Sequence, residues 1–268
     1  MSNPRQTYTH GHHDSVLRSH RWRTAENSAG YLLPHLQPSL RLLDVGTGAG
    51  TITVDLAGRL SDGAVVGVDV APAAVAATRE LAEQAGVDVE VALGDVYALD
   101  HDDGSFDVVH AHQVLQHLGD PVAALREMKR VARPGGLVAV RDADYAAMTW
   151  YPGSAELDRW LELYRSLART NGGEPDAGRR LRSWGRAAGL TEVASTASAW
   201  CFADRADLAW WTGTWAERLT ASAFAEQAVA RGLSDPAELA RLAQGWLSWG
   251  ERPDAWFSVL HGELLARC

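Results

Sequence analysis

An acidic residue followed by three alternating glycines stands out in the stretch 42–50, which reads LLDVGTGAG. Glycine adopts positive φ readily and lets the backbone approach a ligand closely, so Gly46, Gly48 and Gly50 after an apolar run indicate a ligand-binding turn. A phosphate-binding P-loop would need Gly-Lys-Ser/Thr, and no lysine follows here. A dinucleotide fingerprint would need glycine at position 51, where the chain has Thr51. The spacing therefore favours neither of these phosphate ligands.

Carboxylates near this turn indicate the charge of the ligand. Asp44 would repel a pyrophosphate and attract a cationic amine, and S-adenosylmethionine carries an ammonium and a sulfonium but no phosphate. Asp69 ends the next apolar run, about 20 residues further on, where a carboxylate can accept both ribose hydroxyls of NAD or of adenosylmethionine. Asp95 can accept an adenine amino group, with Val70 and Val96 flanking the ring. One such acid could be a helix N-cap, but three on successive strands favour a site.

The pattern around these residues predicts strands that alternate with helices. We expect strands at 41–46, 64–70, 87–95, 105–113 and 137–144, with helices at 51–60, 71–86 and 120–136. The alternation is typical of βαβ crossovers and of a mostly parallel sheet with helices on both faces. Ligands bind such sheets at the carboxyl ends of the strands. Further along, we expect helices at 154–170, 179–190, 204–219 and 236–251, and strands at 191–203 and 254–268.

Length and composition allow one large α/β domain of 268 residues. The net charge of −9 argues against a nucleic-acid or anionic-membrane partner. Cys201 and Cys268 lie far apart, which predicts no disulfide and no cysteine zinc site. No apolar leader and no run of about 20 apolar residues is visible, so we expect a cytoplasmic protein. The 11 Trp against 4 Phe indicate an apolar cleft or a homodimer interface, or, as readily, plain core packing.

Several stretches together resemble the class I S-adenosylmethionine-dependent methyltransferases. The resemblance covers roughly residues 40–142 and is nearest to the branch of ubiquinone/menaquinone-biosynthesis C-methyltransferases and small-molecule enzymes of bacterial secondary metabolism. The family often has Cys-Gly-x-Gly in the turn, and this chain has small residues there that preserve a close backbone approach. The stretches are LLDVGTGAGTIT, VVGVDVAP, VALGDVYAL and FDVVHAHQVLQHLGDPVAALREMKRVARPGGLVAV.

The resemblance implies a Rossmann-like fold with a seven-stranded sheet that ends in an antiparallel hairpin. It divides the chain into a helical lid at 1–38 and a methyltransferase domain at 39–268, with a cofactor half at 39–145, cap elements at 146–255 and a closing strand at about 255–266. It implies S-adenosylmethionine as cofactor, S-adenosylhomocysteine as product, and no metal. The methionine part would be held by Asp44, Gly46, Thr47 and Gly48, the ribose by Asp69, and adenine by Asp95 beside Val96.

Residues after the fourth and fifth strands are the candidates for meeting the methyl acceptor. Methyl transfer is an in-line displacement in which the protein mainly positions the reactants, and a general base is needed only if the acceptor must lose a proton. His112 ends the fourth strand, Gln113 and His117 follow it, and the family implies cofactor contacts for all three. Either histidine is a candidate base, although a structural or cofactor contact is the commoner role. Asp142 could orient the acceptor or accept its proton, as could Asp144.

The segment before the sheet is rich in histidine and arginine. In the family that the chain resembles, such a segment covers the cofactor, so Tyr8, His13 and Arg23 are candidate contacts to methionine or acceptor, with His13 also a candidate catalytic group. A histidine-rich run can also bind metal, but no HExxH-like pair is present. Tryptophans at 150, 200, 210, 211 and 215 could wall an apolar site, which would suit an aromatic, polyketide or prenylated small molecule.

Two other functions stay open on the residues alone. An NAD(P)-dependent oxidoreductase would need Gly at position 51 and a Tyr-x-x-x-Lys pair, and Lys129 has no tyrosine four residues before it. An adenosylmethionine-binding cyclase, isomerase or regulatory relative would share the cofactor edge, because fold does not fix function. Only true methyl transfer forms S-adenosylhomocysteine. The sequence leaves open the acceptor, the atom that is methylated, the use of a base and the oligomeric state.

Overall fold

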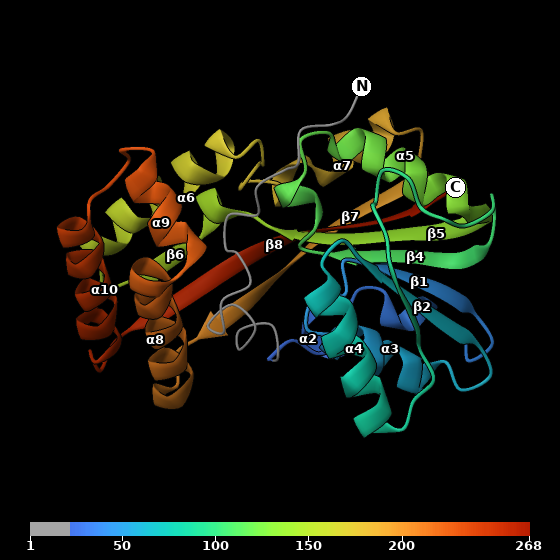
Figure 1. The fold of residues 1–268 in the computed structure, drawn as a ribbon, viewed down its shortest axis with the longest axis horizontal. Coiled ribbons are helices and arrows are strands. Elements are labelled where there is room, and N and C mark those ends of the chain that lie inside the picture. The colour runs from blue at the N-terminus through green and yellow to red at the C-terminus, as the bar shows by residue number, and fades with distance from the viewer. Residues whose placement is uncertain (1–21) are drawn as a thin grey trace.

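The computed structural model describes residues 22–268, and an eight-stranded sheet forms its centre (Figure 1). Five parallel strands lie in the order β3 (Glu90–Leu93), β2 (Ala64–Asp69), β1 (Arg41–Val45), β4 (Phe106–His112) and β5 (Ala132–Ala143). The strand order reverses between β1 and β4. In an open α/β sheet this reversal marks the ligand-binding edge, where Asp44, the glycine turn and His112 lie.

The remaining strands extend the sheet beyond β5 in the antiparallel sense. β8 (Trp256–Arg267) lies beside β5, and its other edge pairs with β7 (Thr191–Phe202). A three-residue strand, β6 (Thr149–Tyr151), pairs with the first residues of β8. The last strand of the chain is thus inserted inside the sheet rather than added at its edge.

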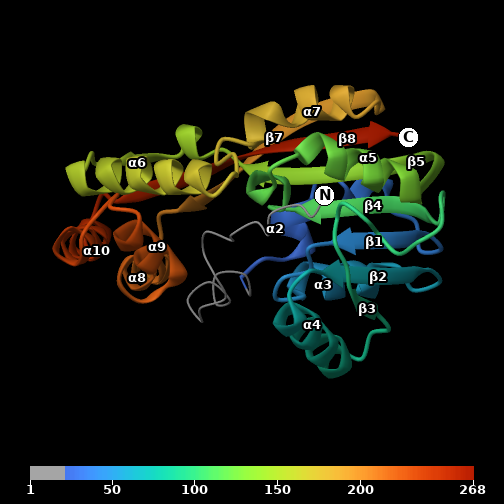
Figure 2. The same cartoon turned by 45° about the horizontal axis from the view of Figure 1, so that its top comes forward.

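Helices cover both faces of the parallel half (Figure 2). α2 (Ala25–Ala29) and α3 (Thr51–Arg59) share an apolar core with one face, where Leu32, Leu42 and Val108 are fully buried. α5 (Pro121–Val131) and α7 (Leu181–Ala187) pack on the opposite face. α4 (Pro72–Ala85) lies against α3 and β2, begins at a proline and ends at Gly86 with positive φ.

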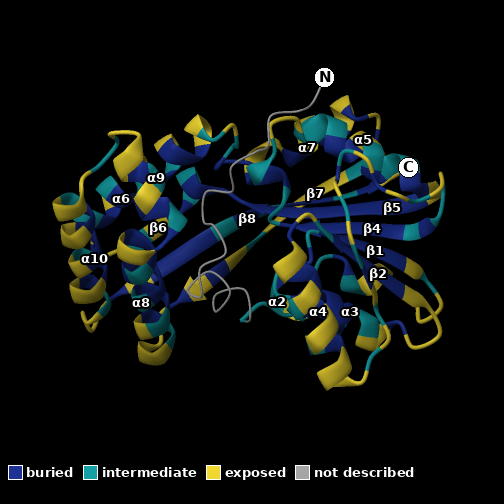
Figure 3. Cartoon of the chain, viewed as in Figure 1, coloured by how far each residue is buried: buried dark blue, intermediate teal, exposed yellow. Residues whose placement is uncertain are grey.

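A helical cap packs around the amino-terminal end of β8. It consists of α6 (Ala155–Thr170), α8 (Arg205–Ala221), α9 (Ala223–Ala230) and α10 (Pro236–Gly250). Its core is aromatic: Trp160 is fully buried, and its ring centroid lies 4.4 Å from that of Trp215 and 4.8 Å from that of Trp246. Figure 3 shows β8 as a buried stripe that runs from the sheet into this cap. β8 therefore contributes side chains to the core of the cap and to the core of the sheet, and it joins the two.

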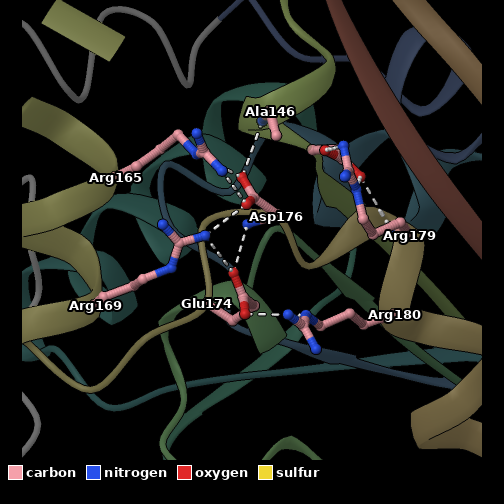
Figure 4. A network of polar contacts seen from close by, with 8 residues as sticks. Ala146, Arg165, Arg169, Glu174, Asp176, Arg179 and Arg180 are labelled. Carbon is pink, nitrogen blue, oxygen red and sulfur yellow. Dashed lines mark hydrogen bonds and ion pairs between the residues drawn. The ribbon is translucent and has the colours of Figure 1, made fainter. Parts of the chain in front are cut away.

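Arginine–carboxylate pairs fix the cap to the carboxyl end of β5 (Figure 4). Arg165 and Arg169 of α6 both donate to Asp176, at 2.7 and 2.6 Å, and Asp176 also accepts from the backbone N–H of Ala146. Arg179 donates two bonds to buried Asp144, at 2.6 and 2.7 Å. Such bidentate pairs fix orientation as well as distance. Asp144, which the sequence offered as a group to orient the acceptor, serves this ion pair.

The predicted architecture is confirmed, with differences at its margins. The helix expected over 120–136 ends at Val131, and β5 begins at Ala132, before the Pro-Gly-Gly run. β6 and α9 were not expected, so the sheet has one strand more than the family resemblance implied. Within residues 22–268 no helix is long and apolar enough to cross a membrane. The division into lid and domain at residue 38 stays a prediction.

Candidate active site

The glycine turn between β1 and α3 is built as its sequence predicts. Gly46, Gly48 and Gly50 have φ values of +79°, +56° and +81°, a region that favours glycine. The N–H of Gly46 donates to the carbonyl of Val68 at 2.7 Å, which holds the turn against β2. A Cβ on Gly46 would lie 2.4 Å from Cγ2 of Val114, so the turn accepts no side chain there.

Asp69 organises the turn from the end of β2. Its Oδ2 accepts the N–H of Gly48 and its Oδ1 accepts the N–H of Ala71, both at 2.9 Å. A carboxylate has about four acceptor positions, so each oxygen keeps one for a further donor such as a ribose hydroxyl. The N–H donors of the turn and the free acceptor positions of Asp69 therefore meet at one point of the sheet edge.

Two apolar side chains are exposed beside Asp69. Val70 is 76% exposed and Leu93, at the end of β3, is 59% exposed, whereas Val96 is buried. Asp95 is exposed, and its Oδ1 accepts the N–H of Tyr97 at 3.0 Å. Exposed aliphatic groups next to a carboxylate are what a flat heteroaromatic ring with an exocyclic amine can cover. The fit supports the ring-flanking position predicted for Val70 but not for Val96, which is buried, and the role of both stays a prediction.

Asp44 is buried and already has two protein partners. Its Oδ1 lies 2.7 Å from Nδ1 of His110, and its Oδ2 accepts the hydroxyl of Thr53 at 2.6 Å. The hydroxyls of Thr47 and Thr78 are also hydrogen-bonded to each other, at 3.0 Å. The carboxylate therefore braces β1 against β4 and α3 below the turn. Contact between Asp44 and a ligand ammonium stays a prediction, and the sequence did not single out His110.

The strand register gathers polar side chains on one face of the sheet, beneath α2. Residues paired across neighbouring strands share a face, as do residues two apart on one strand. Asp44 is opposite His110, His112 is opposite Arg141, and Arg141 is opposite Glu263. We call this set the polar row: Asp44, His110, His112, Arg141, Glu263, His261 and Ser198. Arg141 and Glu263 form a buried ion pair with 3.4 Å between Nε and Oε1.

His112 lies in the polar row at the end of β4. Its ring centroid is 5.8 Å from that of Trp200 and 6.1 Å from that of His261. Within residues 22–268 neither ring nitrogen has a hydrogen-bond partner. Burial, and then the charges of Arg23 and Arg141, hold the pKa of His112 well below its ordinary value. The imidazole is therefore neutral at pH 7 and can accept a hydrogen bond.

Asp142 and His117 meet at a different place, the 3-10 turn η2 (Leu115–His117). Oδ1 of Asp142 accepts the N–H of Gln116 at 3.0 Å, while no partner for Oδ2 is found among residues 22–268. Burial raises the pKa of Asp142 to about 7. Nε2 of His117 lies 3.0 Å from Nε2 of Gln116, which donates, and burial lowers the pKa of His117 to about 3. Asp142 therefore holds the backbone that carries His117.

Of the three candidate residues near the N-terminus, the structure describes only Arg23. Tyr8 and His13 lie outside the described residues. Arg23 donates from Nη2 to Oε1 of Gln113 at 2.8 Å, so two predicted cofactor contacts bind each other above the end of β4. The sequence did not single out His261 or Arg141, which lie beside them. The sequence indicates these two residues only by placing a polar side chain within a largely apolar strand.

The tryptophans offered as walls of an acceptor site are mostly cap core. Trp211 and Trp215 are buried among the cap helices, whereas Trp200 packs over the polar row and donates its Nε1–H to the carbonyl of Asn27 at 2.8 Å. Plain core packing, the other interpretation of the tryptophan enrichment, holds for most of them. In the part of the chain that the structure describes, no three His, Cys, Asp or Glu side chains are placed to hold a metal ion.

Comparison with known proteins places this chain in a family. A family model described as a methyltransferase domain matches residues 36–197. An uncharacterized methyltransferase of Schizosaccharomyces pombe is 36% identical over 269 residues, covering 96% of this chain and 95% of the relative. A demethylmenaquinone methyltransferase of Roseiflexus castenholzii is 38% identical over 161 residues, covering 58% and 63%.

A solved structure shows the same fold in a protein with another activity. The crystal structure of the cyclase SpnF superposes with a TM-score of 0.51 at 24% identity, over 93% of this chain and 80% of that one. With the sheet order, the glycine turn and the family match taken together, the chain belongs to the class I S-adenosylmethionine-dependent methyltransferases.

Proposed function

We propose that this protein binds S-adenosylmethionine at the carboxyl edge of β1, β2 and β3 and transfers its methyl group to a small apolar or aromatic molecule. The observation that carries the proposal is the joint placement of Asp69, the glycine turn and exposed Val70. The acceptor class rests on the likeness to a relative whose name gives demethylmenaquinone, a quinone, as the acceptor.

The residues present fit the cofactor part by part. The N–H groups and bare Cα atoms of the turn would meet the methionine part, and the open acceptor positions of Asp69 would meet the ribose hydroxyls. Val70, Val96 and exposed Asp95 would take the adenine ring and its amino group. The sulfonium supplies an electrophilic methyl group when the cofactor is bound.

The chain's own residues mainly orient the acceptor. The nucleophile of the acceptor forms a bond to the methyl carbon as the carbon–sulfur bond breaks, and any proton on the nucleophile must pass to a base or to water. Neutral His112 has one bare ring nitrogen at the end of β4 that could accept a hydrogen bond or a proton from that nucleophile. Asp142, with a pKa of about 7, could exchange a proton near neutrality, but its Oδ1 is committed to η2. We therefore place His112 first among the candidate groups.

Calorimetric titration tests the cofactor assignment. We expect the protein to bind S-adenosylmethionine and S-adenosylhomocysteine and not NADPH, and the Asp69→Ala variant to lose about a hundredfold in affinity, because hydrogen bonds to a charged group contribute about 1.5–3 kcal/mol each. Asp88→Ala, at an exposed position after α4, is the matched control and should bind as the wild type does. Binding of NADPH alone, or equal affinity in the Asp69→Ala variant, would refute the assignment.

Product analysis separates methyl transfer from the other chemistry that this fold supports. Incubation with quinone-like and aromatic acceptors should form S-adenosylhomocysteine and methylated product in equal amounts. Conversion of the added molecule with no formation of S-adenosylhomocysteine would identify a cyclase or isomerase instead. SpnF, which has a similar fold, is a cyclase by name.

A further inference from the structure

Three hydrogen bonds in series link the N-terminal segment to the last strand of the sheet. Arg23 donates from Nη2 to Oε1 of Gln113 at 2.8 Å. Gln113 donates from Nε2 to Nε2 of His261 at 2.8 Å, and His261 donates from Nδ1 to the carbonyl of Val259 at 3.1 Å. Arginine can only donate and the backbone carbonyl can only accept, so each group in the series has one possible orientation. The amide of Gln113 faces Arg23 with its oxygen because His261 accepts from its nitrogen.

The backbone of Gln113 is held in an uncommon conformation next to the glycine turn. Gln113 has a φ of +54°, which few residues other than glycine adopt, and its N–H donates to the carbonyl of Arg141 at 2.7 Å. The next residue, Val114, packs so closely on Gly46 that a Cβ there would lie 2.4 Å away. Strained backbone of this kind persists where the surroundings determine it, and it concentrates at functional sites. A change in the Gln113 amide would therefore reach the turn through Val114.

The surroundings of His261 keep its ring neutral. The ring is fully buried, with its centroid 4.3 Å from that of Trp200, and the guanidinium carbons of Arg23 and Arg141 lie over Trp200 at 5.6 and 5.1 Å. Burial, followed by these two cations, lowers the pKa of His261 well below its ordinary value. His261 thus presents a permanent acceptor at Nε2 and a donor at Nδ1.

We propose that His261 is a positioning residue of the methyl-donor site, which fixes the Gln113 amide and so holds Arg23 above the end of β4 and Val114 against the glycine turn. The inference rests on the proposed function, because the turn is the place where the cofactor would bind. His261 would touch neither the cofactor nor the acceptor. Its effect would pass through Gln113, the first residue after β4.

Two substitutions at position 261 separate hydrogen bonding from packing. His261→Gln keeps an acceptor that can reach Gln113, whereas His261→Phe keeps an aromatic ring and leaves the half-buried Nε2 of Gln113 without its acceptor. We expect His261→Phe to weaken S-adenosylhomocysteine binding about tenfold by calorimetry, and His261→Gln to stay within about threefold of the wild type. His35→Phe, an exposed histidine in η1 (Leu33–His35), is the matched control. Equal affinities in His261→Phe and the wild type, or equal losses in both variants, would overturn the proposal.

A spectroscopic measurement tests the hydrogen-bond series without any cofactor. Nitrogen-15 NMR of the wild type should show His261 as the neutral tautomer protonated at Nδ1, and Gln113→Leu should shift the Nε2 resonance of His261. A proton on Nε2, or no shift in Gln113→Leu, would disprove the series itself. If the wild type binds no S-adenosylhomocysteine while the NMR result holds, the proposed function fails and the series of hydrogen bonds stands.

Discussion

Acidification should destabilise this protein because three histidines are kept neutral in the fold. The pKa values of His112, His117 and His261 are lowered by burial from an ordinary 6.5. Each ring therefore binds a proton in the unfolded chain at pH 5.5 but not in the folded protein. Stability that is present above pH 6.5 is lost as the pH falls, by about 1 kcal/mol per histidine between pH 6.5 and 5.5.

Protonation of Asp142 raises the free energy of unfolding between pH 6.5 and 5.5, opposite to the effect of the histidines. Burial raises its pKa from 3.8 to about 7, so the folded protein takes up a proton that the unfolded chain does not bind until the pH is far lower. This uptake stabilises the fold by about 1 kcal/mol between pH 6.5 and 5.5. The expected net result is a loss of about 2 kcal/mol in the free energy of unfolding.

Urea titrations at pH 6.5 and 5.5, followed by tryptophan fluorescence, would measure this difference if unfolding is reversible and two-state. The Asp142→Asn variant retains an oxygen for the Gln116 N–H and removes the opposing group, so its loss should increase to about 3 kcal/mol. A free energy of unfolding that is unchanged or higher at pH 5.5 in the wild type would refute the reasoning. So would an Asp142→Asn variant with the same pH dependence as the wild type.

Two further predictions concern the glycine turn and the ion pair between Arg179 and Asp144. Gly46→Ala should lose at least about a hundredfold in S-adenosylhomocysteine affinity by calorimetry, because its φ is +79° and its Cβ would meet Val114. Gly58→Ala in α3, where a Cβ meets nothing within 4 Å, is the control: it should bind S-adenosylhomocysteine as the wild type does, and its free energy of unfolding should rise by about 0.5–1 kcal/mol. Equal affinities in the two variants would contradict the turn geometry. Arg179→Ala should lower the free energy of unfolding measured in urea by about 1–3 kcal/mol, because it removes the two side-chain hydrogen bonds that buried Asp144 accepts and leaves only the bond from the backbone N–H of residue 179. Arg252 pairs with Asp254, and both side chains are about half exposed, so Arg252→Ala should change the free energy of unfolding by less than about 1 kcal/mol. An equally small effect of Arg179→Ala would show that the pair with Asp144 does not stabilise the fold.

The cofactor half was predictable because its signals are local. The turn from Gly46 to Gly50 is specified by residues that need positive φ, and the strand and helix before and after it follow from short apolar periods. Asp69 could be placed on the same edge as the turn because parallel strands all end there. These inferences need only neighbouring residues and the rule that successive parallel strands share an edge.

The antiparallel half was harder to place from sequence. β8 was expected as a closing strand, but its position between β5 and β7 depends on pairing with strands about 60 and 120 residues earlier, for which one sequence contains no register signal. The tryptophans beyond residue 149 fitted either a site wall or a core. The structure places Trp160, Trp215 and Trp246 in the cap core, because four helices and the start of β8 together can enclose them.

The sequence alone determined the class of fold, the glycine turn and the carboxylate edge of this protein. Only the tertiary structure decided the partners of the buried polar groups: Asp44 with His110, Arg141 with Glu263, and Gln113 with His261. A buried charge or imidazole needs a partner, but chemistry does not say which of several polar residues along the chain will supply it. That choice is made by strand register, which brings residues of β1, β4, β5 and β8 onto one face of the sheet.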